Sequence, residues 1–279
     1  PPRSTLFPYT TLFRSDEKLA GQKMMRCLER YLSNAPKSFL YKMLRKKNIT
    51  LNNSKATGDE KLKCGDTIKI FFSDETFEKF SADNNRTVND DYYSRIYRPL
   101  DIIYENSDVI FINKPSGMLS QKAKPEDVSL VEYLIAHLIH EGEINASDLA
   151  SFKPGICNRL DRNTSGIVAA GKTTKGLQQL SEAFKLRTLG KYYLCIVKGS
   201  VDKRALIKGY LYKDNKTNKV TIIRTETKDS LPIETEYIPV CSNGNVTLLK
   251  IHLLTGRSHQ IRAHLASIGH PLIDRKSVV

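Results

Sequence analysis

One stretch of this chain combines an acidic residue, two basic neighbours and a run of turn-forming residues. Residues 155–172 read GICNRLDRNTSGIVAAGK, with Asp161 between Arg159 and Arg162. Residues 163–166 are all turn formers, so we predict that Asp161 lies on a loop. A loop carried by a sheet is where catalytic groups tend to lie. Spacing alone leaves open a second interpretation, in which Asp161 only braces a turn and pairs with its arginine neighbours.

The same stretch carries a much more specific pattern. Residues 159–166 read R-L-D-R-N-T-S-G, which closely resembles the catalytic motif of the RluA-type pseudouridine synthases, RNA-modifying enzymes that isomerise uridine in place. Two further stretches match this family in the same order, namely residues 191–193 (KYY) and residues 254–271 (LTGRSHQIRAHLASIGHP). By these three ordered motifs, the chain is identified as a member of that family, similar to its RluC- and RluD-like branch.

The resemblance assigns three catalytic positions. It implies that Asp161 is the essential carboxylate, that Arg262 in H-Q-I-R pairs with this acid, and that Tyr193 stacks on the flipped base. A paired cation favours the charged carboxylate, and flipping is needed because the sugar bond is inaccessible inside a stacked helix. Without the resemblance, Arg262 could equally be a surface arginine on an amphipathic helix, and Tyr193 a core tyrosine on a strand.

Further residues follow from the same motifs. Lys114 and Pro115 lie in N-K-P-S-G, which resembles the family's opening motif and implies that they shape the floor of the site; a strand-end lysine is the alternative. Asn158 stands where many relatives have His, and because an amide cannot titrate we predict a structural or substrate-positioning role, not that of a general base. The residues expected to contact substrate or RNA in this region are Lys114, Asn158, Arg159, Arg162, Arg257 and His259.

Composition points to a polyanionic partner. The chain has 279 residues, with 44 Lys and Arg against 30 Asp and Glu, a net charge of +14. Such an excess suits RNA, DNA or an anionic membrane surface. No apolar run approaches the ~20 residues that span a bilayer, and no signal peptide opens the chain. The five cysteines are scattered singly, which favours a reducing cytoplasm. We expect a cytoplasmic, monomeric protein.

The N-terminal region divides into two segments. Residues 1–15 resemble a translated sequencing adapter, so we expect a non-native leader outside the fold. Residues 16–80 carry two helical patterns and short strands ending in L-K-x-G-D-x-I, which resembles the αL RNA-binding module. Asn48 stands at the family's glycine, where we expect a left-handed turn. Four basic residues around the second helix are predicted phosphate contacts, although a solvated helix face is the alternative: Lys42, Arg45, Lys46 and Lys47.

The remaining chain forms a linker and the catalytic domain. Residues 81–98 are polar and without periodicity, so we predict a linker there. Residues 99–279 are expected to form an α+β domain with a mixed, mostly antiparallel sheet and helices on its faces. Residues 274–279 depart from the family pattern, and we expect a truncation that removes the last strands and leaves the chain poorly soluble or inactive.

Other enzyme classes lack their signatures. There is no G-x-S-x-G of a serine hydrolase, no P-loop and no G-x-G-x-x-G. His259 and His264 are five residues apart and face different sides of a helix, so we predict no metal site. An isomerisation also needs no cofactor. A transfer-RNA pseudouridine synthase and a non-catalytic RNA-binding protein remain as alternatives, while the αL-like module favours ribosomal RNA of the large subunit.

Overall fold

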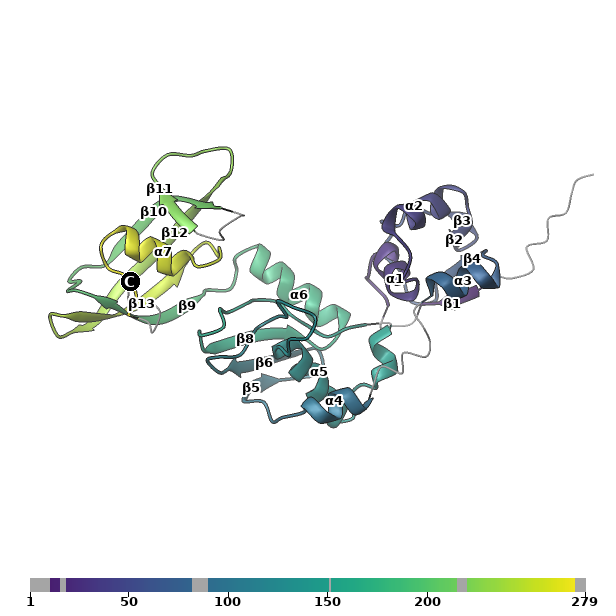
Figure 1. The fold of residues 1–279 in the computed structure, drawn as a ribbon, viewed down its shortest axis with the longest axis horizontal. Helices are drawn as coiled ribbons and strands as arrows, with labels where there is room; N and C mark the ends of the chain where they lie inside the picture. The colour runs from purple at the N-terminus through teal and green to yellow at the C-terminus, as the bar shows by residue number, and fades with distance from the viewer. Residues whose placement is uncertain (1–10, 16–18, 82–89, 151, 215–219, 274–279) are drawn as a thin grey trace, which may run out of the picture. The chain divides into compact units, whose positions relative to one another are not determined.

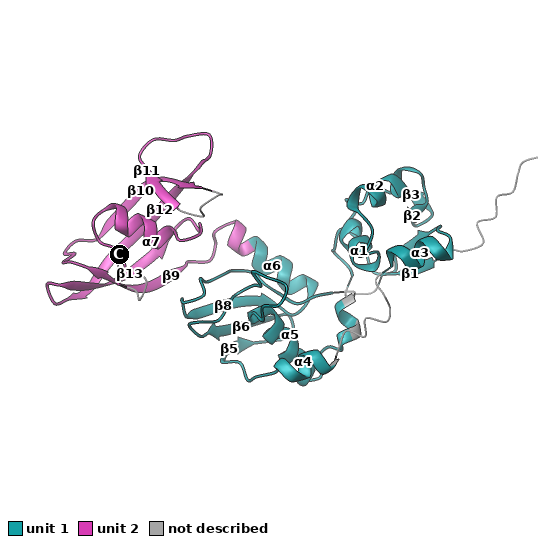
Figure 2. Ribbon diagram, viewed as in Figure 1, with its two compact units in different colours: residues 1–182 teal, residues 183–279 magenta. Residues whose placement is uncertain are grey.

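The computed structural model describes residues 11–15, 19–81, 90–150, 152–214 and 220–273. The chain forms two compact units, residues 1–182 and residues 183–279 (Figure 2). The boundary between them falls within helix α6 (Thr174–Lys185). The two units are described separately below.

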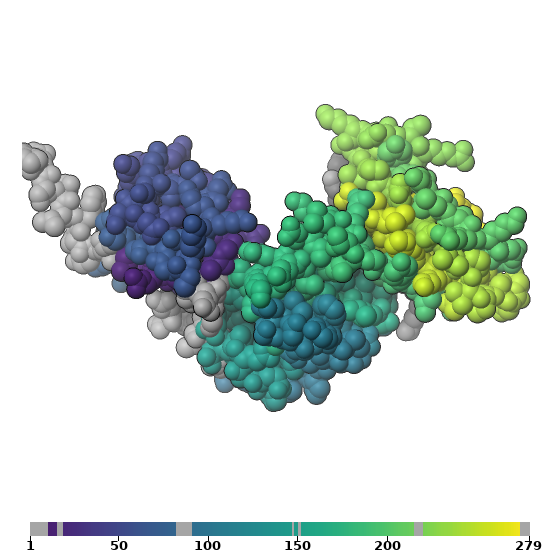
Figure 3. All heavy atoms as spheres, turned by 180° about the vertical axis from the view of Figure 1, so that it is seen from behind, coloured from purple at the N-terminus to yellow at the C-terminus, as the bar shows by residue number. Residues whose placement is uncertain are grey.

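The first unit begins with a small α+β module. Its helices are α1 (Met24–Tyr31), α2 (Lys37–Arg45) and α3 (Asp74–Phe80). Its antiparallel sheet has the order β1-β4-β2-β3, with β1 (Thr11–Arg14), β2 (Ile49–Leu51), β3 (Ser54–Lys55) and β4 (Thr67–Ile70). Apolar side chains of α1, α2, β2 and β4 are buried together, so the module has a core of its own. Its atoms form a rounded body, purple to blue in Figure 3.

Strand β1 lies within residues 1–15, the segment that we expect to be a non-native leader. Thr11–Arg14 pairs in register with Thr67–Ile70. Because alternate side chains of a strand point to opposite faces, Phe13 packs on the core while Leu12 stays exposed. The ring centroid of Phe13 lies 4.1 Å from that of Tyr31. The strand thus covers an edge of the sheet that would otherwise be unpaired; residues 1–10 lie outside the described part of the chain.

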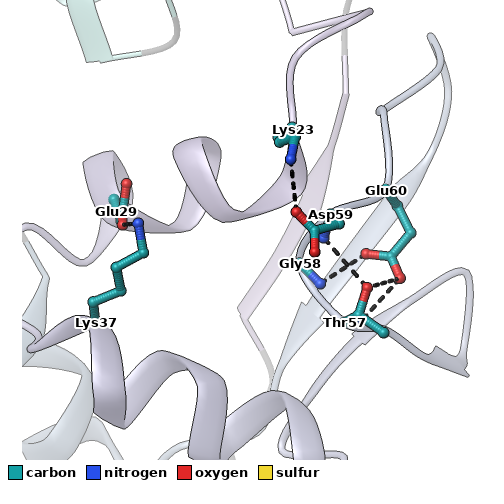
Figure 4. A network of polar contacts seen from close by, with 7 residues as sticks. All are labelled: Lys23, Glu29, Lys37, Thr57, Gly58, Asp59 and Glu60. Carbon is teal, nitrogen blue, oxygen red and sulfur yellow. Dashed lines mark hydrogen bonds and ion pairs between the residues drawn. The ribbon is translucent and has the colours of Figure 1, made fainter. Parts of the chain in front are cut away.

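Polar contacts fix the turns of this module (Figure 4). The carboxylate of Glu60 accepts hydrogen bonds from the backbone and hydroxyl of Thr57 and from the backbone N–H of Gly58, each at 2.8 Å. Gly58 has φ +94°, a backbone conformation that favours glycine because residues with a Cβ rarely adopt it. Lys37 of α2 lies 2.8 Å from Glu29 of α1 and joins the two helices.

The end of α2 differs from the sequence expectation. The left-handed residue is Lys47, with φ 60°, and Asn48 is not among the residues of positive φ in the described chain. The N–H of Asn48 donates to the carbonyl of Met43 at 2.9 Å. The helix therefore closes one residue earlier than the position of the family's glycine indicates, at a conformational cost of about 1 kcal/mol for a residue with a Cβ.

Part of the predicted linker is helical. Helix α4 (Asp90–Ile96) lies within residues 81–98, and Tyr93 packs against Ile135 and Ala136 of α5 (Leu130–His140). The prediction missed this helix because its apolar side is supplied mainly by tyrosines among polar residues. Residues 82–89 lie outside the described part of the chain.

The second part of unit 1 is a four-stranded antiparallel sheet. Its order is β5-β6-β8-β7, with β5 (Ile102–Glu105), β6 (Val109–Lys114), β7 (Gly155–Ile156) and β8 (Gly166–Gly171). A short 3-10 turn covers Ala146–Ala150. Along β6 the buried positions are Ile110, Ile112 and Lys114, because they share one face of the strand. Lys114, the last residue of the strand, therefore points into the interior.

Unit 2 is a five-stranded antiparallel sheet with one helix against it (Figure 1). The order is β11-β10-β12-β13-β9. The strands are β9 (Tyr192–Lys198), β10 (Ala205–Lys213), β11 (Val220–Ile223), β12 (Ser230–Ser242) and β13 (Val246–Leu253), and the helix is α7 (Gln260–Ser267). Leu265 of α7 packs on Val197, Leu249 and Ile251. Separate helices on antiparallel sheets confirm the predicted α+β class. Within the described residues, no helix is both long and apolar enough to cross a membrane.

Candidate active site

Asp161 lies on the loop that joins β7 to β8, as the turn-forming residues after it predict. The N–H of Thr164 donates to the carbonyl of Asp161 at 3.0 Å and closes a tight turn. Asp161 and its neighbours Arg159 and Arg162 are all exposed. The loop therefore presents one carboxylate and two guanidinium groups to solvent.

Both neighbours of Asp161 are bound to the segment that follows β6. On one side, the hydroxyl of Ser120 donates to the carbonyl of Leu160 at 2.7 Å and accepts from the N–H of Leu160 at 3.1 Å. On the other side, the carbonyl of Arg162 accepts from the N–H of Gly117 at 2.8 Å and from Nζ of Lys114 at 3.2 Å. The backbone that carries the acid is thus anchored directly before and directly after it.

Lys114 is a wholly buried cation. Its Nζ donates to the carbonyl oxygens of Pro115 at 3.0 Å, Met118 at 2.9 Å and Arg162 at 3.2 Å. Burial lowers the pKa of Lys114, while the charge of Asp161 acts in the opposite direction. No part of this side chain is exposed, and its three partners are backbone groups of the loops around Asp161. The expected contact of Lys114 with RNA stays a prediction.

Three more side chains form hydrogen bonds in or around this loop. Arg162 Nε donates to the carbonyl of Gly117 at 3.1 Å, and the hydroxyl of Ser116 donates to the carbonyl of Asn163 at 2.9 Å. Asn158 donates from Nδ2 to the carbonyl of Ile167 at 3.1 Å and accepts the N–H of Ala169 at 2.8 Å. The amide of Asn158 thus ties the start of the loop to β8, which is a structural task.

Tyr193 and Arg262 belong to the second unit. Tyr193 lies in β9, half-buried, on the face of the sheet that packs against α7. Its neighbour Tyr192 points to the other face, where its ring stacks on His252 with centroids 4.6 Å apart. Arg262 lies on α7 and is half-buried. Of the two tyrosines in KYY, Tyr193 is therefore the one on the sheet face that packs against α7, the helix that carries Arg262.

Buried polar residues hold the start of α7. Gln260 donates from Nε2 to the carbonyl of Glu234 at 3.1 Å and to the hydroxyl of Thr235 at 3.0 Å. Its Oε1 accepts from the hydroxyl of Thr255 at 2.9 Å and from the N–H of Arg257 at 3.1 Å. All four bonds of this amide are made inside the protein, so Gln260 fixes the loop before α7 against β12.

His264 completes this buried cluster. It is 2 % exposed, and its Nδ1 lies 3.0 Å from the hydroxyl of Thr235. Burial lowers the pKa of His264, against a hydrogen bond with the backbone of Lys208 that acts to raise it. Sequence reasoning missed the roles of Gln260 and Thr255; the signal available was the i, i+4 spacing of Gln260 and His264, which places both on one face of a helix.

The remaining predicted residues are distributed over both units. His259 precedes α7 with φ 55° and is exposed, as is Arg257. A Cβ on Gly256 would lie 3.1 Å from Lys191 Nζ, so the glycine makes room for this cation. In the N-terminal module all four predicted phosphate contacts are exposed, namely Lys42, Arg45, Lys46 and Lys47. Among the described residues, no group of three or more His, Cys, Asp or Glu side chains is placed to hold a metal ion.

Comparisons with known proteins agree on one family. Residues 108–267 match the family model described as RNA pseudouridylate synthase. An uncharacterized RNA pseudouridine synthase of Mycoplasma pneumoniae is 33% identical over 254 residues, which cover 90% of this chain and 75% of the relative. Ribosomal large subunit pseudouridine synthase C of Vibrio cholerae is 28% identical over 263 residues, covering 92% and 76%.

A further relative and a solved structure extend this picture. Ribosomal large subunit pseudouridine synthase D of Borreliella burgdorferi is 30% identical over 249 residues, covering 88% of this chain and 73% of the relative. A solved structure, human RNA pseudouridylate synthase domain containing 4, has a TM-score of 0.51 at 20% identity and covers 66% of this chain and 69% of the other. At this identity the solved structure supports the fold.

Proposed function

This chain belongs to the RNA pseudouridylate synthase family, and we propose that it converts specific uridines of large-subunit ribosomal RNA to pseudouridine with Asp161 as the essential carboxylate. Two of the relatives above are named as ribosomal large subunit pseudouridine synthases, which supports the choice of RNA. The net charge of +14 suits a polyphosphate substrate. The enzyme is an isomerase that acts on RNA, and we propose that it works as a cytoplasmic monomer.

The chemistry explains why one ionised acid is central. The bond between C1′ of the ribose and N1 of the base breaks, the base turns, and a bond forms between C1′ and C5. The hydrogen on C5 leaves as a proton and N1 carries a proton in the product, so atoms and electrons balance without a cofactor. A carboxylate next to the anomeric carbon can act either as a nucleophile on the sugar or as a base toward a sugar proton.

The resemblance of the motifs assigns two further catalytic residues in this proposal. In this proposal Arg262 pairs with Asp161, which keeps the carboxylate ionised and directs it, because an adjacent cation favours the charged form. The ring of Tyr193 stacks on the flipped uracil and holds it while the glycosidic bond is open. Four exposed basic residues near the two motifs would bind RNA phosphates: Arg159, Arg162, Arg257 and His259.

The observation that carries the proposal is the anchoring of Asp161. The backbone is hydrogen-bonded directly before and directly after this acid, which holds its Cα in one position. Here Leu160 and Arg162 are each held by groups of the segment 114–120. A catalytic carboxylate gains from such rigidity, because displacement of a reacting group by about 1 Å can cost about 100-fold in rate.

Release of tritium from RNA labelled at C5 of uridine tests the proposal. A soluble preparation of the wild-type chain that melts cooperatively should release tritium from transcripts of large-subunit ribosomal RNA. Asp161→Asn should abolish release while RNA affinity stays within about twofold, since an amide is similar in size but cannot ionise. Release from transfer RNA but not from ribosomal RNA would show that the substrate is transfer RNA. Binding of RNA without release from either RNA by the wild-type chain would identify a non-catalytic RNA-binding protein.

A further inference from the structure

Ser120 makes an unusual contact with the residue before the catalytic acid. It lies in the segment between β6 and α5 and is 5% exposed. One hydroxyl donates to the carbonyl of Leu160 at 2.7 Å and accepts from the N–H of the same residue at 3.1 Å, across 40 positions of sequence. A hydroxyl has one donor and two acceptor sites, so Ser120 can satisfy both backbone groups of Leu160.

Those backbone groups need a partner from within the protein. Leu160 is itself buried, at 8% exposure, and a buried amide without a hydrogen bond costs about 1–3 kcal/mol. Ser120 meets both needs from the side of the sheet, at a point where neither β7 nor β8 pairs with the loop. Ser120 therefore provides the hydrogen-bond donor and acceptor that a neighbouring strand would otherwise offer to the backbone of Leu160.

The contact restrains the backbone at the start of Asp161. The carbonyl of Leu160 lies in the same rigid peptide plane as the N–H of Asp161, because the peptide bond is planar. A hydrogen bond that orients this plane restricts rotation at the Asp161 backbone, and with it the direction of the Cα–Cβ bond. On the far side, Lys114 and Gly117 hold the carbonyl of Arg162. The loop is thus fixed at both ends of a three-residue span.

We propose that Ser120 is a positioning residue for the isomerisation: its hydroxyl holds the peptide plane before Asp161 so that the carboxylate meets the anomeric carbon. The inference rests on the proposed role of Asp161. Ser116 provides a matched control in the same segment. It is also a serine that donates to a backbone carbonyl of this loop, but it is exposed and its acceptor, Asn163, lies two residues after Asp161.

Single-turnover and steady-state rates of tritium release distinguish positioning from general stabilisation. We expect Ser120→Ala to lower kcat by about 10- to 100-fold while the Kd for catalytically inert RNA stays within about twofold, since a misdirected carboxylate affects chemistry and not RNA contacts. Ser116→Ala should keep both constants within about twofold. Ser120→Thr retains the hydroxyl, so it should recover most of the kcat that Ser120→Ala loses.

Each outcome decides the inference. A kcat for Ser120→Ala within about threefold of wild type, a loss confined to KM, or no advantage of Thr over Ala would each overturn it. If circular dichroism shows that Ser120→Ala is unfolded, Ser120→Cys takes its place, because a thiol fills the site but is a weak donor, and the same loss of kcat is expected. The wild-type chain and Asp161→Asn run in the same assay: an inactive wild type or an active Asp161→Asn refutes the proposed function, whereas normal turnover by Ser120→Ala refutes only this inference.

Discussion

Nζ of Lys114 lies 3.2 Å from the carbonyl oxygen of Arg162, the residue that follows Asp161. The ammonium group is buried at the end of β6, and its three donors meet three backbone carbonyls. A compact ammonium can direct three hydrogen bonds into a small space, whereas the planar fork of a guanidinium cannot. Lys114 thus joins the loop after β6 to the loop of Asp161, the proposed catalytic acid.

Replacement of Lys114 should therefore destabilise unit 1. Lys114→Met keeps the length of the side chain but removes the donor to the carbonyls of Pro115 and Met118, and one of the two donors to the carbonyl of Arg162. We expect a loss of about 2 kcal/mol in the free energy of unfolding. Urea denaturation measures it. Lys124→Met is the control, because Lys124 is an exposed lysine of the following segment. Equal midpoints for the two variants would show that the carbonyls find other donors.

The basic surface of α2 should contribute affinity and not chemistry. Replacing Lys42, Arg45, Lys46 and Lys47 by Ala should weaken RNA binding and reduce the slope of log K against log salt by up to ~0.7–0.9 for each RNA phosphate that the variant no longer binds. Turnover at saturating RNA should be retained. Filter binding at several salt concentrations measures the slope.

Two single variants sharpen this comparison. Lys46→Ala should change the salt slope, whereas Lys37→Ala should change it less, because Lys37 is already paired with Glu29 at 2.8 Å. Unchanged slopes for the fourfold variant would place the RNA path outside α2.

Unit 2 should lose stability in mild acid through His264. Burial lowers the pKa of His264 below its ordinary value of 6.5, so the unfolded chain takes up a proton more readily than the folded one as the pH falls. The contribution of the neutral ring to the free energy of unfolding is complete above pH 6.5 and declines below it. We expect a lower melting temperature at pH 5.5 than at pH 7.5, and a smaller difference in His264→Gln. His140→Gln, at an exposed site of unit 1, should keep the full difference in melting temperature between the two pH values. If His264→Gln also keeps it, other titratable groups cause the loss of stability in acid.

Gly176→Ala should lower the stability of the protein, although replacing Gly by Ala within a helix usually raises it. In an exposed helix this change gains about 1 kcal/mol. At Gly176, in the first turns of α6, a Cβ would lie 2.0 Å from the carbonyl oxygen of Asp108, which belongs to the backbone and cannot swing away. We expect a loss of about 1–3 kcal/mol or more, measured by thermal melting. A melting temperature at or above that of wild type would show that α6 can shift away from Asp108 without loss.

Local sequence was sufficient for the loop of Asp161 and for the class of the fold. Turn formers at residues 163–166 followed by an apolar run predict a loop and then a buried strand, and the structure places β8 at Gly166–Gly171. The chain's α+β class follows from similar short-range patterns. Sequence reasoning missed β1 and α4, because strand pairing for β1 and burial of tyrosines for α4 depend on partners remote in sequence.

The motif by itself indicated the catalytic chemistry, but it did not indicate the support for Asp161. The assignment of Asp161 as the catalytic carboxylate is a proposal that rests on the resemblance of three ordered motifs to the family. That Lys114 is buried and that Ser120 binds Leu160 depend on contacts across 48 and 40 residues. Such contacts satisfy buried backbone groups whose positions exist only once the chain has folded, so tertiary structure alone decided them.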